Sequence, residues 1–513
     1  MVIRVKYLLC AVVLICATSC RDKAGIAAIE DEVIFNFVQL NDVYEIAPLG
    51  GGLYGGMARV AYVVDSLKAI NPNTYLFMSG DFLNPSLLGN VKFQGSRIKG
   101  RQMIEVMNAM DFTMVTFGNH EFDLSYASFA QRLNESSFDW VNANCYHDQS
   151  GVLSLFQRHR GALTDTVPQT KILSIESPRG TPLKVGFFGV TIPSNPKPYV
   201  HYADMFEQAS WATQQLQNGD VDMIVALTHL EKNMDLEIAR QNPNIDLILG
   251  GHEHNHMLLQ SGQTVIAKSD ANAKNIYVHQ VRYGDSRKSW QIESKLLPIT
   301  NKTPENQHVA AIVRKWDKVL QQELGSVLDD PNTVIYQAKT PLDGRDKQSR
   351  SEQTNLGMLI TTAMAASFDP PLGAAIVNGG SMRLDDYLSG GITAIDLFRV
   401  LPFGDGILQV ELSGALLKEV LNYGESQKGE GAYLQRYGMT KDASDRWNYQ
   451  GTPIVDHQKY WIAASEYLLR GFDIPFLTPD HPEVYQVLRP NAEDLSADIR
   501  KSIIHYLNNS QND

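Results

Sequence analysis

Short apolar runs that alternate with helical periodicity occupy the chain from about residue 33 to residue 300. Each run suits a buried strand, and the polar or glycine-containing residues after it lead into apolar positions spaced as on a helix. This repetition is typical of an α/β layered domain. The runs that we interpret as buried strands are 33–40, 74–78, 113–117, 221–227 and 245–249.

Residues able to bind a metal follow each of these runs directly. The five segments are Asn41-Asp42-Val43-Tyr44, Ser79-Gly80-Asp81, Gly118-Asn119-His120-Glu121-Phe122-Asp123, Thr228-His229 and Gly250-Gly251-His252-Glu253-His254. In α/β sheets, ligands collect outside the carboxyl ends of the strands, so the five loops are expected to converge on one edge. The pattern predicts one site assembled from distant segments.

The pattern changes after residue 300. A polar stretch at 301–304 precedes a helix whose apolar positions run from Val309 to Leu324, which predicts a connector or the opening of a second domain. Beyond about residue 332, helices such as 355–368 mix with short strands such as 374–377 and 407–412, as in an α+β domain. We expect an export signal (1–20), a first domain (21–300), a linker helix (301–330) and a second domain (331–513), because 513 residues exceed one ordinary core.

Composition and charge restrict the class of partner. The chain is 43% hydrophobic and 20% charged, as in a globular protein. Its net charge is -12, so the chain lacks the excess of basic residues that binding a nucleic-acid polymer requires. A small phosphorylated substrate remains compatible, because a metal supplies positive charge locally. No feature of the sequence bears on the oligomeric state.

The N-terminus has the layout of an export signal. Arg4 and Lys6 precede an apolar run at 7–17 that is too short to span a bilayer permanently. The run ends in Ala17-Thr18-Ser19-Cys20, which resembles a bacterial lipobox with Cys20 as the lipidated residue, although Gly or Ala is usual before the cysteine. We expect an exported lipoprotein, anchored to a membrane in the periplasm or at the cell surface. The alternative is a cleaved signal peptide that ends near a cysteine by chance.

Two metal ions about 3.5 to 4 Å apart need carboxylate, imidazole and carbonyl ligands, with one carboxylate bridging. The five segments supply all of these groups. A single aspartate at a strand end is more often a helix cap than a ligand. The joint order Asp, Gly-Asp, Gly-Asn-His-Glu, His, Gly-His-x-His is not expected by chance in a chain of this length, so it predicts a two-metal site.

This order resembles the calcineurin-like metallophosphoesterase superfamily, and Gly-Asn-His-Glu-Phe-Asp followed by a second domain is similar to the bacterial 5'-nucleotidase family. The resemblance covers nearly the whole mature chain. It implies an α/β/β/α sandwich with a second α+β domain, and a dinuclear metal-dependent phosphoric ester hydrolase. The implied ligands are Asp42, Asp81 and His254 for a first metal, and Asp81, Asn119, His229 and His252 for a second, with Asp81 bridging. The ions are divalent, with Zn, Mn, Mg, Ca and Fe as candidates.

The same resemblance implies the catalytic and substrate-binding residues. His120 and Asp123 match the catalytic dyad, while Glu121 matches the motif without a metal role. Segments of the second domain similar to those of the family imply a phosphate contact at Arg350, a further loop at Asn378 and Arg383, an aromatic face at Phe403, and a second aromatic with a ribose-binding carboxylate at Tyr467 and Asp473. Asn119 is implied as a substrate contact as well as a ligand.

The implied chemistry follows from charge. A phosphate ester repels a nucleophile, so the metals neutralise its oxygens and lower the pKa of a bound water. His120 then stabilises charge on the phosphoryl and leaving-group oxygens, and Asp123 orients the imidazole. The expected reaction is hydrolysis of nucleoside 5'-monophosphates or related nucleotide esters. A cyclic-nucleotide phosphodiesterase or broad phosphatase is an alternative, as is a surface binding lipoprotein with little turnover, against which the near-complete ligand set argues.

Tyr44 is the clearest departure from the family, whose first motif is Asp-x-His where this chain has Asp42-Val43-Tyr44. A tyrosine ligates only as a phenolate, which requires deprotonation from a pKa near ~10 unless a strongly acidic metal drives it. Either Tyr44 ligates an Fe(III)-like ion, or the first metal has one fewer protein ligand and Tyr44 packs or hydrogen-bonds beside it. We favour the second alternative, because most iron-phenolate sites in the superfamily place their tyrosine after the Gly-Asp motif.

Overall fold

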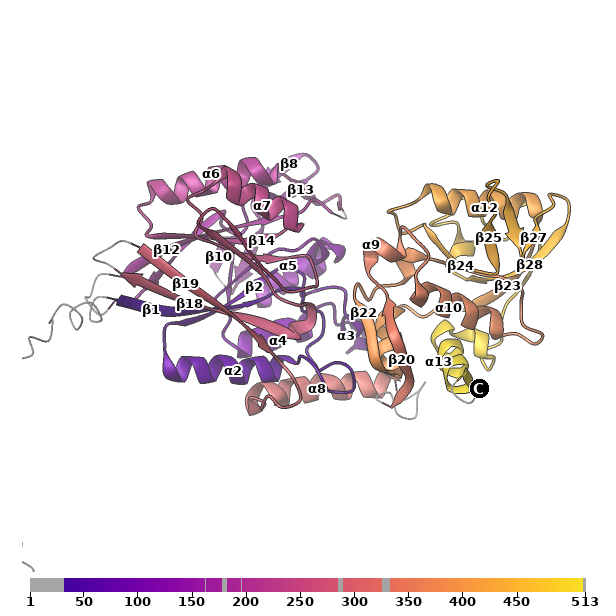
Figure 1. The fold of residues 1–513 in the computed structure, drawn as a ribbon, viewed down its shortest axis with the longest axis horizontal. Coiled ribbons are helices and arrows are strands. Elements are labelled where there is room, and N and C mark those ends of the chain that lie inside the picture. The colour runs from indigo at the N-terminus through magenta and orange to yellow at the C-terminus, as the bar shows by residue number, and fades with distance from the viewer. Residues whose placement is uncertain are drawn as a thin grey trace, which may run out of the picture.

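The structure is a computed structural model that describes residues 32–161, 163–177, 182–194, 196–284, 289–324 and 333–510. The predicted export signal and Cys20 lie outside the described residues. The chain forms two lobes, with the N-terminal half in the indigo to magenta lobe and the C-terminal part in the orange to yellow lobe (Figure 1). Across the described residues, no helix is both long and apolar enough to cross a membrane.

Two six-stranded sheets pack face to face in the first lobe. The first has the order β19 (Ser289–Pro298), β18 (Asn275–Gly284), β1 (Glu32–Leu40), β2 (Thr74–Ser79), β5 (Met114–Thr116) and β6 (Asp139–Trp140). The second has the order β11 (Thr170–Ile175), β12 (Leu183–Thr191), β14 (Met223–His229), β15 (Leu247–Gly251), β17 (Thr264–Lys268) and β16 (Met257–Ser261). Phe37, Phe77 and Phe187 join the sheets, with ring centroids 5.0 to 5.8 Å apart.

Helices cover the outer face of each sheet. Those on the first sheet are α2 (Met57–Ile70), α4 (Arg101–Ala109) and α5 (Tyr126–Glu135), and those on the second are α6 (Met205–Asn218) and α7 (Lys232–Gln241). The α/β/β/α prediction is therefore confirmed. The shorter elements of this lobe are α3 (Leu87–Asn90), β3 (Lys92–Phe93), β4 (Ser96–Arg97), β7 (Cys145–Gln149), β8 (Val152–Ser154), β9 (Gln157–Arg160), β10 (Leu163–Thr166) and β13 (Val200–Tyr202).

The helix expected as a connector, α8 (Gln307–Leu324), packs against α2 and α4. Its Trp316 is fully buried, and Leu320 and Leu324 join the same core cluster. Its apolar stripe is thus covered by the first lobe, as an amphipathic helix requires. The chain passes to the second lobe beyond this helix.

The second lobe is an α+β domain, as predicted. Its five-stranded sheet has the order β24 (Leu434–Tyr437), β21 (Ala375–Asn378), β28 (Lys459–Ser465), β23 (Ile407–Ser413) and β29 (Val484–Leu488). α10 (Asn355–Ala366), α11 (Ala394–Val400) and α13 (Ile499–Ser510) share one core cluster with the sheet, and α12 (Gly414–Ser426) shares another. The smaller elements are β20 (Val334–Asp343) paired with β22 (Tyr387–Thr393), α9 (Asp346–Ser349), β25 (Met439–Lys441), β26 (Trp447–Tyr449) and β27 (Thr452–Pro453).

Parallel pairing brings the predicted ligand loops to one edge. β1 runs parallel to β2 and β2 to β5, while β12, β14 and β15 run parallel in the other sheet. The carboxyl ends of neighbouring strands therefore lie side by side, and the backbone N–H of Asp42 donates to the carbonyl of Gly80 at 3.0 Å. The expected convergence of these loops is present.

Candidate active site

Three buried side chains form the centre of the site. Asp42 follows β1, Asp81 follows β2 and His229 ends β14, and one ligand atom of each lies within 4.8 Å of the others. Asp42 and Asp81 adopt φ values of 53° and 57°, in the left-handed region that non-glycine residues rarely occupy. Such backbone conformations concentrate at functional sites. The cluster is suited to a divalent metal ion.

Two buried atoms support this assignment. His229 Nδ1 lies 2.8 Å from the Ser79 carbonyl, which can only accept, so this nitrogen carries a proton, and in the neutral ring that ligates a metal Nε2 presents its lone pair. His229 Nε2 and Asn119 Oδ1 find no hydrogen-bond partner among the described residues. Buried polar atoms without a partner are rare. A cation held by Asp81, His229 and Asn119 accounts for both.

The two histidines of the Gly-His-x-His segment take different positions. The backbone N–H of His252 donates to Asp42 Oδ2 at 2.9 Å. Burial and the neighbouring His229 lower the pKa of His252 to about 4, so its ring is neutral, the form that ligates a metal. His254 Nε2 lies 3.4 Å from Asp42 Oδ1, and its Nδ1 is hydrogen-bonded to the carbonyl oxygen of Asp385 in the second lobe. The second lobe therefore orients a side chain of the metal site.

Glu121 holds the site together without ligating. Its carboxylate accepts the backbone N–H groups of Asp81, Phe82, Leu83 and Gly118 at 2.6 to 3.0 Å. This fits its motif position without a metal role. A Cβ on Gly118 would collide with Asp81 Oδ1, which explains the glycine before Asn119. The loops after β2 and β5 are thereby fixed to each other.

The predicted dyad lies beside this centre. His120 Nδ1 is 2.8 Å from Asp123 Oδ2, and the backbone N–H of His120 donates to Asp81 Oδ1 at 2.8 Å. Burial lowers the pKa of His120, but the charge of Asp81 and the hydrogen bond and charge of Asp123 outweigh it and raise the pKa to about 9. Burial raises the pKa of Asp123, but its hydrogen bond with His120 and the charges of His120 and Arg383 outweigh burial and hold that pKa well below its usual range. At neutral pH the dyad is an imidazolium held by a carboxylate.

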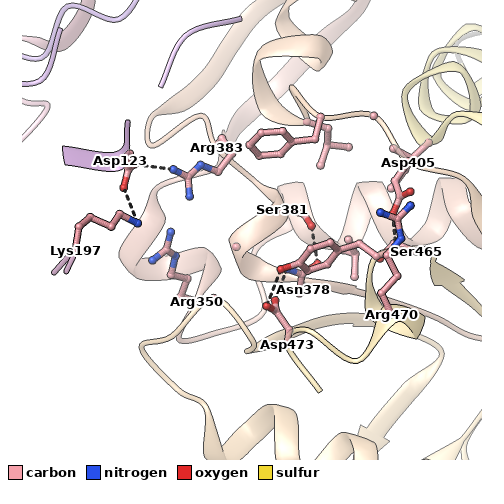
Figure 2. Close-up of a pocket in the computed structure, with 18 residues that line it drawn as sticks. Asp123, Lys197, Arg350, Asn378, Ser381, Arg383, Asp405, Ser465, Arg470 and Asp473 are labelled. Atoms are coloured by element: carbon pink, nitrogen blue, oxygen red, sulfur yellow. Dashed lines mark hydrogen bonds and ion pairs between the residues drawn. The ribbon is translucent and has the colours of Figure 1, made fainter. Parts of the chain in front are cut away.

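A cavity of about 620 Å³ opens between the lobes next to the dyad (Figure 2). All six residues predicted in the second domain line it, together with Asp123 and Lys197 of the first lobe. The six are Arg350, Asn378, Arg383, Phe403, Tyr467 and Asp473. The structure therefore brings distant sequence segments into one cavity, which is bordered by Asp123 of the dyad.

The cavity has a basic end and an aromatic end. Arg383 Nη2 lies 3.0 Å and Lys197 Nζ 3.7 Å from the Asp123 carboxylate, and Arg350 is near them (Figure 2). At the other end, Asp473 accepts hydrogen bonds from Tyr467 Oη at 3.0 Å and Asn378 Nδ2 at 2.7 Å. Phe403 lines the same cavity and is 59% exposed. An anion at one end and a planar ring at the other would fit these surfaces.

Sequence reasoning missed three residues near the site. Lys197 follows the carboxyl end of β12. The rule that ligands collect at strand ends applies to this strand too, but the five predicted strands did not include it. Lys268 ends β17 and is fully buried, where it donates to the Gly251 carbonyl at 2.9 Å and pairs with Asp235 at 2.8 Å. A lysine at the end of an apolar strand was the available signal. No sequence pattern pointed to Asp385, because its contact with His254 joins residues of different lobes.

Comparison with known proteins identifies the two lobes. The family model for calcineurin-like phosphoesterase matches residues 35–256, and the model for the 5'-nucleotidase C-terminal domain matches residues 334–478. The chain belongs to the 5'-nucleotidase family. It is accordingly a metal-dependent phosphoric ester hydrolase of the nucleotide phosphoesterase class, which confirms the expected enzyme class.

Relatives of this family member span most of its length. It is 28% identical over 415 residues to the trifunctional nucleotide phosphoesterase protein YfkN of Bacillus subtilis (strain 168), across 74% of this chain but only 27% of that protein. It is 25% identical over 486 residues to the 5'-nucleotidase of Homo sapiens, across 85% of this chain and 77% of that one. The structure of the 5'-nucleotidase precursor from Thermus thermophilus aligns with a TM-score of 0.67 at 23% identity, covering 93% and 97% of the chains. That likeness supports the fold.

Proposed function

We propose that this enzyme hydrolyses nucleoside 5'-monophosphates to nucleoside and phosphate, with two metal ions at the junction of its lobes. The observation that carries the proposal is the position of Asp123, which pairs with His120 beside the candidate metal cluster and also lines the cavity that has a basic end and an aromatic end. A phosphate monoester of a nucleoside has a dianion, a sugar and a flat base in the same order.

The protein's own groups have distinct tasks in this proposal. Asp42, Asp81, Asn119, His229, His252 and His254 would hold the metal ions. When bound, the ions neutralise the phosphate oxygens and lower the pKa of a water so that it can attack phosphorus. Arg350, Arg383 and Lys197 bind the phosphate dianion at the basic end. His120, already protonated at neutral pH, stabilises the negative charge that develops on the leaving oxygen.

The aromatic end selects for a nucleoside. Phe403 and Tyr467 offer faces to the base, and stacking contributes about 1 to 3 kcal/mol per aromatic with little preference between bases. Asp473, held by Asn378 and Tyr467, accepts hydrogen bonds from the ribose hydroxyls. Several bases should therefore be accepted.

The test is phosphate release by the purified full chain from AMP, cyclic AMP and p-nitrophenyl phosphate, with several divalent metals and after chelation. We expect AMP to be the best substrate and chelation to abolish turnover, with recovery on adding metal. Equal kcat/KM for AMP and the aryl phosphate would refute nucleoside selection. Preference for cyclic AMP would make the enzyme a diesterase.

We further propose that the enzyme acts outside the cytoplasm, tethered through lipid on Cys20 in the periplasm or at the cell surface. The basic, apolar and lipobox-like order of residues 1–20 supports this location. There it would release nucleosides and phosphate from extracytoplasmic nucleotides.

A further inference from the structure

One buried ammonium joins the segments that carry the three predicted metal-binding histidines. Lys268 ends β17 and is fully buried. Its Nζ donates to the carbonyl oxygen of Leu230 and, at 2.9 Å, to that of Gly251, and it also contacts the carboxylate of Glu253. Each of these three residues is directly adjacent in the chain to a predicted ligand, and the ligands are His229, His252 and His254.

Lys268 stays charged in this position. Burial lowers the pKa of its ammonium, but the charges of Asp235 and Glu253 outweigh burial and raise that pKa. Asp235, on α7, is fully buried as well, and its carboxylate lies 2.8 Å from Lys268 Nζ. Buried charges occur where they are paired and hydrogen-bonded, as here. The ammonium is therefore a permanent donor to these groups at neutral pH.

The peptide unit between Gly251 and His252 is held on both sides. Its carbonyl oxygen accepts from Lys268, and its N–H donates to Asp42 Oδ2 at 2.9 Å. Because a peptide unit is planar, the two bonds fix its orientation. His252 adopts a φ of 84° after this peptide, and its ring centroid lies 5.3 Å from that of His229. Such a backbone conformation persists only where the surroundings hold it, and Lys268 supplies one of the two bonds that do so.

Two glycines allow the ammonium to approach this loop. A Cβ on Gly250 would lie 3.0 Å from Lys268 Cε and 3.2 Å from the Asp235 carboxylate. A Cβ on Gly251 would collide with a backbone carbonyl oxygen. A larger residue at either position would displace the loop or the lysine. The Gly-Gly pair before His252 is therefore matched to a lysine at the end of β17.

We propose that Lys268 is a positioning residue for the metal centre. Its ammonium holds the Gly251–His252 peptide so that the imidazole of His252 faces the second metal, which His229 is also predicted to bind. Lys268 itself touches no metal in this role. Its positive charge would disfavour a nearby cation, but Asp235 and Glu253 offset it. The inference rests on the proposed two-metal function.

The test measures Mn²⁺ binding to the metal-free full chain by isothermal titration calorimetry. Lys268→Met keeps a flexible, unbranched side chain and removes the donor. We expect one of the two Mn²⁺ binding events to weaken about 10- to 100-fold, as is typical when a group that orients a metal ligand is removed. KM for AMP at saturating Mn²⁺ should stay at the wild-type value, because the groups that contact the nucleotide are unchanged. Lys268→Gln keeps an amide donor for the Gly251 carbonyl and should recover part of the lost Mn²⁺ affinity.

The matched control is Arg158→Met, which also removes a buried cation. Arg158 pairs with Asp165 at 2.7 Å and donates to the Phe138 carbonyl at 2.6 Å, and none of these groups belongs to the metal-binding segments. This variant should unfold at a lower Tm than the wild type and bind Mn²⁺ with unchanged affinity. A purely structural role of Lys268 would give the same result in Lys268→Met.

Wild-type Mn²⁺ affinity in a folded Lys268→Met overturns the inference, as does an equal loss of affinity in Arg158→Met. If Lys268→Met does not fold by circular dichroism, Lys268→Gln decides in its place. Failure of both variants to fold would show that Lys268 supports the fold as a whole, which also overturns the inference. If the wild type binds Mn²⁺ and Lys268→Met binds it more weakly, but neither hydrolyses AMP, the proposed function is refuted and this inference stands.

Discussion

Replacing His120 with alanine tests the catalytic dyad without disturbing the metal centre. The imidazole of His120 contacts Asp123, whereas its contact with Asp81 is made by the backbone N–H, at 2.8 Å. Alanine keeps that N–H. Asp123 Oδ2 also keeps its hydrogen bonds from Asn84 at 3.1 Å and Arg383 at 3.0 Å, so its buried charge remains paired. The variant should therefore fold and bind metal as the wild type does.

The expected loss of turnover follows from the charge that the variant removes. His120 is protonated at neutral pH because its pKa is raised to about 9, so the substitution removes a positive, proton-donating group. A positioned acid of this kind contributes about 10² to 10⁴ in rate, or roughly 2.7 to 5.5 kcal/mol of barrier. We expect kcat for AMP to fall by this factor.

The assay measures kcat and KM for AMP together with metal content by mass spectrometry on the same sample. His256→Ala is the matched control, because His256 is half-exposed, pairs with Asp270 and lies outside the proposed ligand set. It should keep wild-type turnover. Full activity of His120→Ala would show that His120 takes no part in the mechanism. Loss of metal in that variant would show that the imidazole, and not only the backbone N–H of His120, supports the metal centre.

Three further substitutions test other parts of the molecule. Phe403→Ala should raise KM for AMP by about 5- to 150-fold, from the 1 to 3 kcal/mol of a lost stack, and leave p-nitrophenyl phosphate unaffected; equal effects on both substrates would refute a role in base binding. Burial raises the pKa of Asp246 to about 6, so its carboxylate costs stability as pH rises from about 4 through 6. Asp246→Asn, whose side-chain oxygen can still accept from Ile224, should raise the unfolding free energy by about 3 kcal/mol at pH 8 and by nothing below pH ~4. An effect on urea melts that does not depend on pH would contradict this. Cys20→Ser should move the protein from the membrane fraction to the soluble fraction, and membrane retention would show that another feature anchors it.

The sequence by itself determined the fold and grouped the three side chains of the candidate metal cluster. Alternation of apolar runs with helical periodicity depends only on local chemistry, and the rule that ligands follow strand ends needs only the chain order. Strand 33–40 was expected and β1 spans Glu32–Leu40, while the helix expected at 355–368 is α10 at Asn355–Ala366. Asp42, Asp81 and His229 could be grouped for this reason before their distances were known.

The tertiary structure decided what depends on direction and distance between remote segments. Residue type left the surroundings of Tyr44 open, and only the tertiary structure places its hydroxyl 3.2 to 3.3 Å from Asp42, Asp81 and His254. Amphipathic periodicity predicted that α8 has one apolar face, but it did not predict that the first lobe covers that face. The contact of His254 with Asp385 and the basic end around Arg383 and Lys197 join residues far apart in the chain. Packing of the two lobes creates them, and no local pattern in the sequence encodes that packing.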